Sequence, residues 1–304
     1  MDLRDIEYFS VIAEHGHLGR AAEALGLGQP ALSISLRRLE QAAEAKLVKR
    51  TPKGVELTAV GTALLSHVRR LQLARDDLAR EVADLAHGRA GHLRIGASSG
   101  NAEAVLPEVC SALLADAPKL EIDVVVRDNE ALLPALRKGE LDLVVAHIEP
   151  HPLPGLHQEA AGQDEFIMYC SARNPFAGRR RLKLADLANQ RWVSTPASAT
   201  TSWLSLKRTF AEHGLPQPQF ALLSESVAVR LRAVAASSDL LGIGSKRTVQ
   251  RHARQMGLVI MPVQDLGWVR PVAVAYRQDA YLSPAAKRFI EILKKTAKEI
   301  AMQP

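Results

Sequence analysis

The sharpest chemical motif in this chain is Gly96-Ala97-Ser98-Ser99-Gly100, which matches G-x-S-x-G between an expected strand and an expected helix. In an α/β hydrolase, such a turn exposes a nucleophilic serine. Here the strand opens its domain, so no earlier loop can supply half of an oxyanion hole, and no Asp-then-His pair stands out at later strand ends. The sequence therefore argues against an enzyme.

A serine-rich loop before a helix has a second use, which is to hold an anion. Free backbone N–H groups and the helix dipole favour negative charge, and the hydroxyls add hydrogen bonds. We expect Ser98, Ser99 and Asn101 to contact a ligand in this way. The alternative that these residues only cap the helix stays open, because Ser and Asn are common caps.

A comparable loop occurs later in the chain. Thr200 and Thr201 open another expected helix, and Thr195 ends the strand before it. If the two helix starts face one cleft, a small anionic ligand such as a carboxylate would contact both. We therefore add these three threonines to the predicted effector site.

Cofactor motifs are incomplete. Gly242-Ile243-Gly244 lacks the third glycine of a dinucleotide fingerprint, and no G-K-[ST] phosphate loop occurs. The histidines and cysteines show no metal-ligand spacing, and Cys110 and Cys170 lie in apolar patterns typical of core residues. We expect no cofactor and no metal, while a redox role for either thiol stays open.

The clearest charge asymmetry lies near the N-terminus. Residues 1–60 hold eight basic and eight acidic residues, yet residues 37–53 hold six basic residues against Glu40 and Glu44. This local patch says more about an anionic partner than the whole-chain charge of +6 does.

Hydrophobic spacing predicts three short helices in the same region. In the third, Leu32, Leu36 and Leu39 recur at helical spacing and predict a buried stripe. The opposite face then carries Pro30, Ile34, Arg37, Arg38 and Gln41. Two helices joined by a glycine turn, the second presenting arginines, are typical of a helix-turn-helix that enters the DNA major groove. An unrelated helical domain with a solvated charged face is the alternative.

The turn sequence Thr51-Pro52-Lys53-Gly54 lies between two short apolar runs and predicts a β-hairpin. This hairpin would be a wing that places Arg50 and Lys53 near phosphates. We therefore predict an N-terminal, all-α winged helix-turn-helix domain over residues 1–60.

A long linker helix is predicted from Thr58 to about His87, without an internal proline. Its apolar positions alternate steps of four and three, the heptad seam of a coiled coil, with one polar interruption. The seam consists of Leu64, Val68, Leu71, Arg75, Leu78, Val82 and Leu85. We expect residues 61–89 to join two copies of the chain into a dimer or tetramer.

Residues 90–304 alternate predicted strands and helices, which indicates an α/β domain. Predicted strands are 92–96, 120–126, 141–146, 166–170, 192–193, 220–223 and 240–243, with helices at 102–116, 131–138, from about 201, and at 227–236. Two such sets would form two lobes around a cleft. We place the first lobe at about 90–162 and 268–304, and the second at about 163–267.

Composition places the chain among soluble globular proteins, at 47% hydrophobic and 24% charged residues. No apolar stretch approaches the roughly 20 residues needed to span a bilayer. The N-terminus mixes acidic residues among apolar positions and does not have the form of a secretory signal. We therefore expect a cytoplasmic protein without membrane contact.

Spaced motifs along the whole chain resemble the LysR family of transcriptional regulators. The N-terminal matches are Ala21-Ala22, Leu25, Gln29-Pro30-Ala31-Leu32-Ser33, Leu36, Leu39-Glu40, Leu47-Val48-Lys49-Arg50, Leu57-Thr58 and Gly61. Gly139-Glu140-Leu141-Asp142-Leu143 and Leu282-Ser283-Pro284-Ala285-Ala286 resemble the effector domain of the same family. His17, Gly19 and Gly28 depart from the pattern where the family has Ser or Thr.

The resemblance implies a periplasmic-binding-protein-like, two-lobed effector domain and no catalytic activity. Its implied partners are promoter DNA, a small-molecule effector, further copies of the chain and RNA polymerase. It adds Gln29, Pro30, Ala31 and Ser33 to the DNA-binding residues, and Asn129 and His147 to the effector-binding residues. A solute-binding protein or a small-molecule-processing enzyme on the same two-lobed fold is the remaining alternative.

Overall fold

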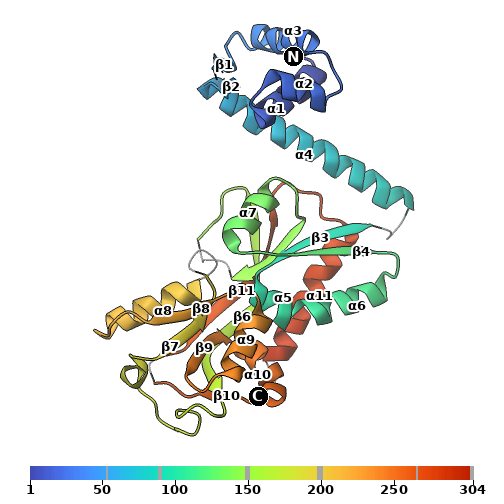
Figure 1. Ribbon diagram of the computed structural model, residues 1–304. Helices are drawn as coiled ribbons and strands as arrows, with labels where there is room; N and C mark the ends of the chain where they lie inside the picture. Colours follow the sequence, from blue (N-terminus) through green and yellow to red (C-terminus); the bar gives the residue numbers. More distant parts are fainter. Residues whose placement is uncertain (53, 88–90, 148–150, 197–200, 265, 302–304) are drawn as a thin grey trace. The chain divides into compact units, whose positions relative to one another are not determined.

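The computed structural model describes residues 1–52, 54–87, 91–147, 151–196, 201–264 and 266–301 (Figure 1). It contains two compact units, Met1–Arg80 and Glu81–Pro304. The first unit is mostly helical and the second is α/β, which confirms the predicted fold class.

The first unit contains three short helices, a hairpin and the start of a long helix. These elements are α1 (Leu3–His15), α2 (Leu18–Ala24), α3 (Gln29–Ala42), β1 (Val48–Thr51), β2 (Gly54–Leu57) and α4 (Ala59–His87). The predicted stripe of α3 is buried, because Leu32, Leu36 and Leu39 pack against Phe9 and Ile12 of α1. The hairpin pairs Val48 with Leu57, as the turn sequence predicts.

The long helix α4 begins one residue after Thr58, whose Oγ1 accepts the N–H of Gly61. Its first turns belong to the core of this unit, where Val68 is 1% exposed. Further along, the seam residues Leu71 and Leu78 are exposed. The predicted seam is therefore wrong at its start, because Val68 is already covered by the unit's own core.

The second unit has many short elements along the chain. They are β3 (His92–Ala97), α5 (Ser99–Ala104), α6 (Leu106–Asp116), β4 (Glu121–Val126), α7 (Asn129–Arg137), β5 (Leu143–His147), β6 (Leu156–Ser171), the 3₁₀ turn η1 (Leu184–Leu187), β7 (Arg191–Ser194), α8 (Thr201–Glu212), β8 (Gln219–Leu223), α9 (Val227–Ala236), β9 (Leu240–Ser245), α10 (Lys246–Met256), β10 (Leu258–Met261), β11 (Trp268–Arg277) and α11 (Pro284–Ala301).

One mixed sheet runs through this unit. Over the described residues, its strand order is β4-β3-β5-β11-β6-β9-β7-β8, with β10 paired to residues Met168–Ser171 of β6. Neighbouring strands are parallel at β4-β3-β5 and at β9-β7-β8, as the strand-helix alternation predicts. Between these parallel groups, β6 and β11 are long and antiparallel to their neighbours.

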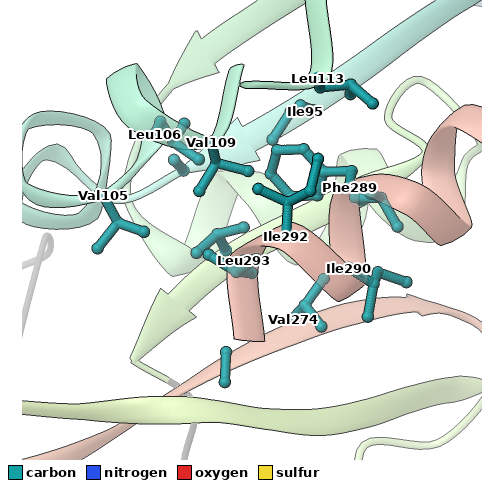
Figure 2. Close-up of a cluster of buried hydrophobic side chains, with 14 of the residues drawn as sticks. Ile95, Val105, Leu106, Val109, Leu113, Val274, Phe289, Ile290, Ile292 and Leu293 are labelled. Carbon is teal, nitrogen blue, oxygen red and sulfur yellow. The ribbon is translucent and has the colours of Figure 1, made fainter. Parts of the chain in front are cut away.

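Two lobes form because separate cores cover the two parallel groups. The first lobe is the core of β3, β5, α6 and α11, where Phe289 and Leu293 lie among Ile95, Val109 and Leu113 (Figure 2). The second lobe is built from β7, β9 and helices α8, α9 and α10 around Trp192, Phe210 and other buried side chains. Strands β6 and β11 contribute to both cores.

The predicted helix at 102–116 is wrong as a single element. Helix α5 ends at Ala104, and α6 starts at Leu106 with Pro107 in its first turn. Proline has no N–H and its ring clashes with the carbonyl four residues earlier, which favours a helix break one turn before it and suits Pro107 to the first turn of α6. The carbonyl of Glu103 is thereby left free for another donor.

Candidate nucleic-acid interface and ligand cavity

The outer face of α3 presents most of the residues predicted to contact DNA. Gln29, Pro30, Ala31, Ile34, Arg37 and Arg38 are exposed on α3, Arg50 is exposed on β1, and Ser33 is half-buried. Lys53 lies outside the described residues. Pro30 occupies the first turn, where no helical hydrogen bond is lost.

The two arginines of this face have different surroundings. The guanidinium of Arg38 lies 2.6 Å from the carboxylate of Asp5, which is 4% exposed and also accepts the hydroxyl of Ser35 at 2.5 Å. Burial alone would raise the pKa of Asp5, but the hydrogen bonds from Arg38 and Ser35 hold it below its usual value. Arg38 thus fixes α3 against α1. No described side chain forms an ion pair with Arg37.

A second buried carboxylate ties α3 to the wing. Glu40 accepts the backbone N–H of Leu47 at 3.0 Å and the ammonium of Lys46 at 2.7 Å. Burial opposes the charge, yet these bonds leave the pKa of Glu40 below its ordinary value. Recognition helix and wing therefore form one rigid surface.

The departure at His17 has a structural explanation. Its Nδ1 accepts the N–H of Gly19 at 3.1 Å, so the histidine caps α2 where the family has a hydroxyl residue. The cap is kept, although the side chain differs.

The second unit contains a small cavity between the two lobes. Its volume is about 40 Å³, enough for one or two water molecules and too little for a typical effector. Several residues predicted from sequence line it, namely Ser98, Ser99, His147 and Thr195. In this arrangement of the lobes, the cavity does not admit a ligand much larger than water.

Two predicted effector residues support the cavity from behind and do not line it. Asn101 donates its amide to the hydroxyl of Ser98 at 3.0 Å, and Asn129 donates to the carbonyl of His147 at 2.6 Å. In this arrangement of the lobes, the amide groups of both residues are bonded within the first lobe, and their contact with an effector stays a prediction. Thr200 and the side chain of Thr201 lie outside the described residues.

Sequence reasoning missed a buried cation that the second lobe contributes to the cavity. Arg230 lines the cavity, is 7% exposed, and donates to the carbonyls of Ser224 and Glu225 at 2.6 and 2.9 Å. No carboxylate among the described residues forms an ion pair with it. Burial lowers the pKa of Arg230, as expected for a cation away from water. Its position in an apolar helix, VAVRLRAVAA, was the signal available in the sequence.

The start of α10 also meets the cavity. Ser245 is its N-cap residue, but the hydroxyl donates to Asp164 at 2.8 Å, so α10 has no side-chain cap. Thr248, in the first turn, is 4% exposed and its Oγ1 has no hydrogen-bond partner. The helix therefore presents uncapped N–H groups near a buried hydroxyl.

Two buried titratable groups lie beside each other at the cavity. The Nε2 of His147 is 3.6 Å from the Oδ2 of Asp164, which exceeds a hydrogen bond. Burial, followed by the guanidinium of Arg270, lowers the pKa of His147 to about 4, with weak opposition from the carbonyl of Pro271. Burial raises the pKa of Asp164 to about 6 despite the hydrogen bond from Ser245. Neither ring nitrogen nor the Oδ2 makes a hydrogen bond of good geometry.

A clasp joins the lobes at the same level. Arg251 of α10 donates to the carbonyl of Glu103, freed by the helix break, at 2.8 Å and pairs with Glu108 at 2.5 Å. His252 lies 2.8 Å from the carboxylate of Glu103. These contacts favour the closed arrangement in which the cavity is small.

The first glycine of each of the two motifs G-x-S-x-G and G-I-G is required by packing. A Cβ on Gly96 would lie 2.7 Å from Leu132 and Leu141, and one on Gly242 would lie 2.2 Å from the ring of Tyr169. The hydroxyl of Ser98 accepts the amide of Asn101. The first glycine of each pattern therefore reflects close packing, and the Ser98 hydroxyl is bonded to a neighbouring side chain.

The thiols are not activated. Cys110 is half-buried and Cys170 is fully buried, and burial raises the pKa of Cys170 to about 11. His92, Glu121 and Asp123 lie together on β3 and β4, a grouping that the sequence spacing did not indicate. All three are exposed, and a 2.8 Å contact already joins His92 to Asp123.

Comparisons with known proteins agree with both units. Residues 3–62 match the bacterial regulatory helix-turn-helix protein, lysR family, and residues 86–298 match the LysR substrate binding domain. The chain belongs to the LysR family of transcriptional regulators. It is a DNA-binding regulator with an effector-binding domain and is not an enzyme.

Individual relatives cover nearly the whole chain. The SDS degradation transcriptional activation protein of a Pseudomonas strain is 30% identical over 94% of this chain and 93% of its own. The regulator CbbR of Rhodospirillum rubrum is 28% identical, with 97% of each chain covered. Full-length CbnR complexed with its target DNA has the same fold, with a TM-score of 0.65 at 21% identity over 98% of this chain and 100% of that chain.

The opposed pKa shifts of His147 and Asp164 predict cancelling pH effects on folding. Because the folded pKa of His147 is lowered from 6.5 to about 4, its contribution to stability is lost as the pH falls across that range. Because that of Asp164 is raised from 3.8 to about 6, its contribution increases as the pH falls. Each slope is at most about 1.4 kcal/mol per pH unit.

Single substitutions should separate the two effects. Relative to the parent protein, Asp164→Asn should lose unfolding free energy between pH 6.5 and 4, and His147→Gln should gain it between pH 6 and 4. Urea unfolding at several pH values measures both. Parallel curves for parent and variants would show that the two groups titrate normally.

Proposed function

We propose that this regulator reads promoter DNA through α3 and the wing and responds to a small anionic effector held between its lobes. The observation that carries the effector part is Arg230, a buried cation on the cavity wall bonded only to backbone carbonyls among the described contacts. We assign DNA binding to residues 1–60, the linker to 61–89 and effector binding to 90–304. We also propose that it acts in the cytoplasm; no described helix is long and apolar enough to cross a membrane.

The DNA proposal divides the work of the two arginines. Arg37 is exposed and without an ion-pair partner among the described residues, so it is the better candidate for a base edge. Arg38, paired with Asp5, positions the helix. Ile34 is 55% exposed beside them and is suited to a thymine methyl, the apolar group of the major groove. Gln29, Pro30, Ala31, Ser33, Arg50 and Lys53 complete the proposed interface.

The proposed anion site differs from the two helix starts expected from the sequence, which are those of α5 and α8. Helix α5 has only six residues, and the start of α8 adjoins residues outside the described ranges. The uncapped start of α10 and the guanidinium of Arg230 together offer N–H donors and positive charge. A carboxylate is the small anion that this combination suits, with Ser98, Ser99, His147 and Thr195 on the surrounding wall.

Binding can reach the DNA through a change in lobe separation. The effector must open the clasp of Arg251 and then contact both lobes, so it stabilises one lobe arrangement over another. In an oligomer, such a change could alter the spacing of the DNA-binding units. Recruitment of RNA polymerase would follow from that change.

Oligomerisation is a property of LysR regulators, and α4 offers the surface for it. Leu71, Leu78, Val82 and Leu85 are 52%, 60%, 56% and 80% exposed along one seam. We propose that two α4 helices pair along these residues.

Arg37→Ala should weaken binding to the promoter fragment of its own gene by about 1 to 3 kcal/mol, the usual worth of a base-reading arginine. The matched variant Arg38→Ala should instead lower the urea midpoint, because buried Asp5 loses its cation. Fluorescence anisotropy at several salt concentrations and urea unfolding measure the two effects. Equal DNA affinity for parent and Arg37→Ala would contradict the assignment.

Leu71→Glu combined with Leu78→Glu should dissociate the dimer and weaken promoter binding, since like charges would face each other across the seam. Sedimentation velocity reports the assembly. The double variant Arg70→Glu with Arg69→Glu, exposed on the same helix but off the seam, is the control. An unchanged sedimentation coefficient for the leucine variant would rule out this helix as the dimer contact.

Arg230→Met should abolish thermal stabilisation by small carboxylates in a panel of benzoate, succinate and pyruvate, each tested against its neutral amide. Arg173→Met is the control, because Arg173 also donates to two backbone carbonyls but does not line the cavity. Amides that bind as tightly as the acids would overturn the anionic effector.

A further inference from the structure

Beside the cavity lies a cluster of polar atoms that have no hydrogen-bond partner among the described residues. These atoms are the Oδ2 of Asp164 and the Oγ1 of Thr248, with the ring of His147 beside them. Thr248 and His147 line the cavity, and Asp164 lies directly behind them, next to His147 and Ser245. Asp164 and Thr248 are 2% and 4% exposed, so they are withdrawn from bulk solvent. Buried polar groups in native proteins are nearly always hydrogen-bonded, so unpaired atoms around one cavity mark it as a candidate site for a polar ligand.

The elements that supply these groups differ, which makes a local packing accident a poor explanation. His147 ends β5 of the first lobe, Asp164 lies on the crossing strand β6, and Thr248 belongs to α10 of the second lobe. Ser245 connects them, since it lines the cavity and donates its hydroxyl to the other oxygen of Asp164. A single small molecule at this position would contact all three elements.

The chemistry of the cluster specifies the complementary group. A carboxylate oxygen accepts hydrogen bonds only, a threonine hydroxyl can both donate and accept, and a neutral imidazole offers one acceptor nitrogen. A second carboxylate has no proton to donate to the Oδ2 of Asp164 and would add a like charge beside it. A hydroxyl or an amine, in contrast, donates to the Oδ2 and accepts from, or donates to, Thr248.

We propose that the effector carries a hydrogen-bond donor, a hydroxyl or an amino group, that binds Asp164 and Thr248 while its acidic group binds at Arg230. The inference rests on the proposed function, because it places the donor on the same molecule as the anion. The effector is thus a hydroxy acid or an amino acid in the chemical sense, and a simple carboxylic acid is a poor ligand.

Matched acids test the donor directly on the full-length protein. The two series are succinate, malate and aspartate, and benzoate, 3-hydroxybenzoate and 3-aminobenzoate, measured by calorimetric titration. In at least one series a donor-bearing acid should bind at least about tenfold tighter than its parent acid, as expected for one charge-assisted hydrogen bond. Asp164→Asn and Thr248→Val should each reduce that advantage. The hydroxy and amino members distinguish the two kinds of donor.

A parent acid that binds as tightly as its hydroxy and amino counterparts overturns the donor and leaves the anionic effector intact. Loss of all acid binding in Arg230→Met, together with the tenfold preference in the parent protein, supports both the anionic effector and its hydrogen-bond donor. If the acids and their amides bind equally, the anion assignment fails, and the donor inference is then judged on the ligand-free protein.

Unfolding of the ligand-free protein provides that judgement. Thr248→Val removes a hydroxyl that has no partner, so the urea midpoint should stay the same or rise. Thr209→Val is the matched control: Thr209 is equally buried on α8, and its hydroxyl donates to the carbonyl of Ser205 at 2.9 Å. This control should unfold at lower urea. A midpoint for Thr248→Val that falls as far as that of the control shows a hydroxyl already satisfied and overturns the inference.

Discussion

The effector-binding unit depends on the antiparallel pairing of β6 with β11. These strands pair from Phe166 opposite Trp268 to Leu156 opposite Arg277, with one register shift between Val272 and Ala273. One end of each strand lies in the core of the first lobe and the other in the core of the second. Both lobes therefore share a sheet, and any opening of the cavity must bend or twist these two strands.

The same pairing explains why charge is buried between the lobes. Asp164 and Arg270 are opposite each other in the strand register, at the level where the two cores meet. Arg270 also lies 4.8 Å above the ring of Phe166, a cation–π contact that holds the guanidinium in place. A carboxylate so enclosed costs free energy unless it is fully hydrogen-bonded, and here one oxygen is not. The folded protein already bears the free-energy cost of burying this oxygen without a hydrogen bond. A ligand that donates a hydrogen bond to it removes that cost and therefore binds more tightly.

The DNA-binding unit uses buried charge for the opposite purpose. Asp5 accepts hydrogen bonds from Ser35 and Arg38 of α3, and Glu40 accepts them from the residues that lead into the wing, so their burial holds these elements in a fixed geometry. The exposed groups of α3 are consequently presented on a rigid surface. The buried carboxylates Asp5 and Glu40 thus hold elements together, whereas the Oδ2 of Asp164, beside the proposed effector site, has no hydrogen-bond partner among the described residues.

The sequence by itself determined the features that depend on local periodicity. The helix-turn-helix, the hairpin, α4 and the parallel strand-helix units follow from spacings of two, three and four residues, and those predictions were confirmed. Four of the eight predicted effector residues, Ser98, Ser99, His147 and Thr195, lie on the cavity wall. The sequence could place them because each ends or follows a strand whose direction the strand-helix pattern gives.

Only the tertiary structure decided the rest. The first half of β6 is largely polar and looks like a loop, since its pairing with β11 joins residues about a hundred positions apart, beyond any local pattern. The different roles that we propose for Arg37 and Arg38 depend on Asp5, which pairs with Arg38 and lies more than thirty residues earlier in the sequence. Arg230, Asp164 and Thr248 belong to no sequence motif. Their proposed roles follow from their burial in the folded protein and from the hydrogen bonds that they make or leave unmade there. Hydrogen-bond satisfaction is a property of three-dimensional surroundings, and spacing along a chain does not contain it.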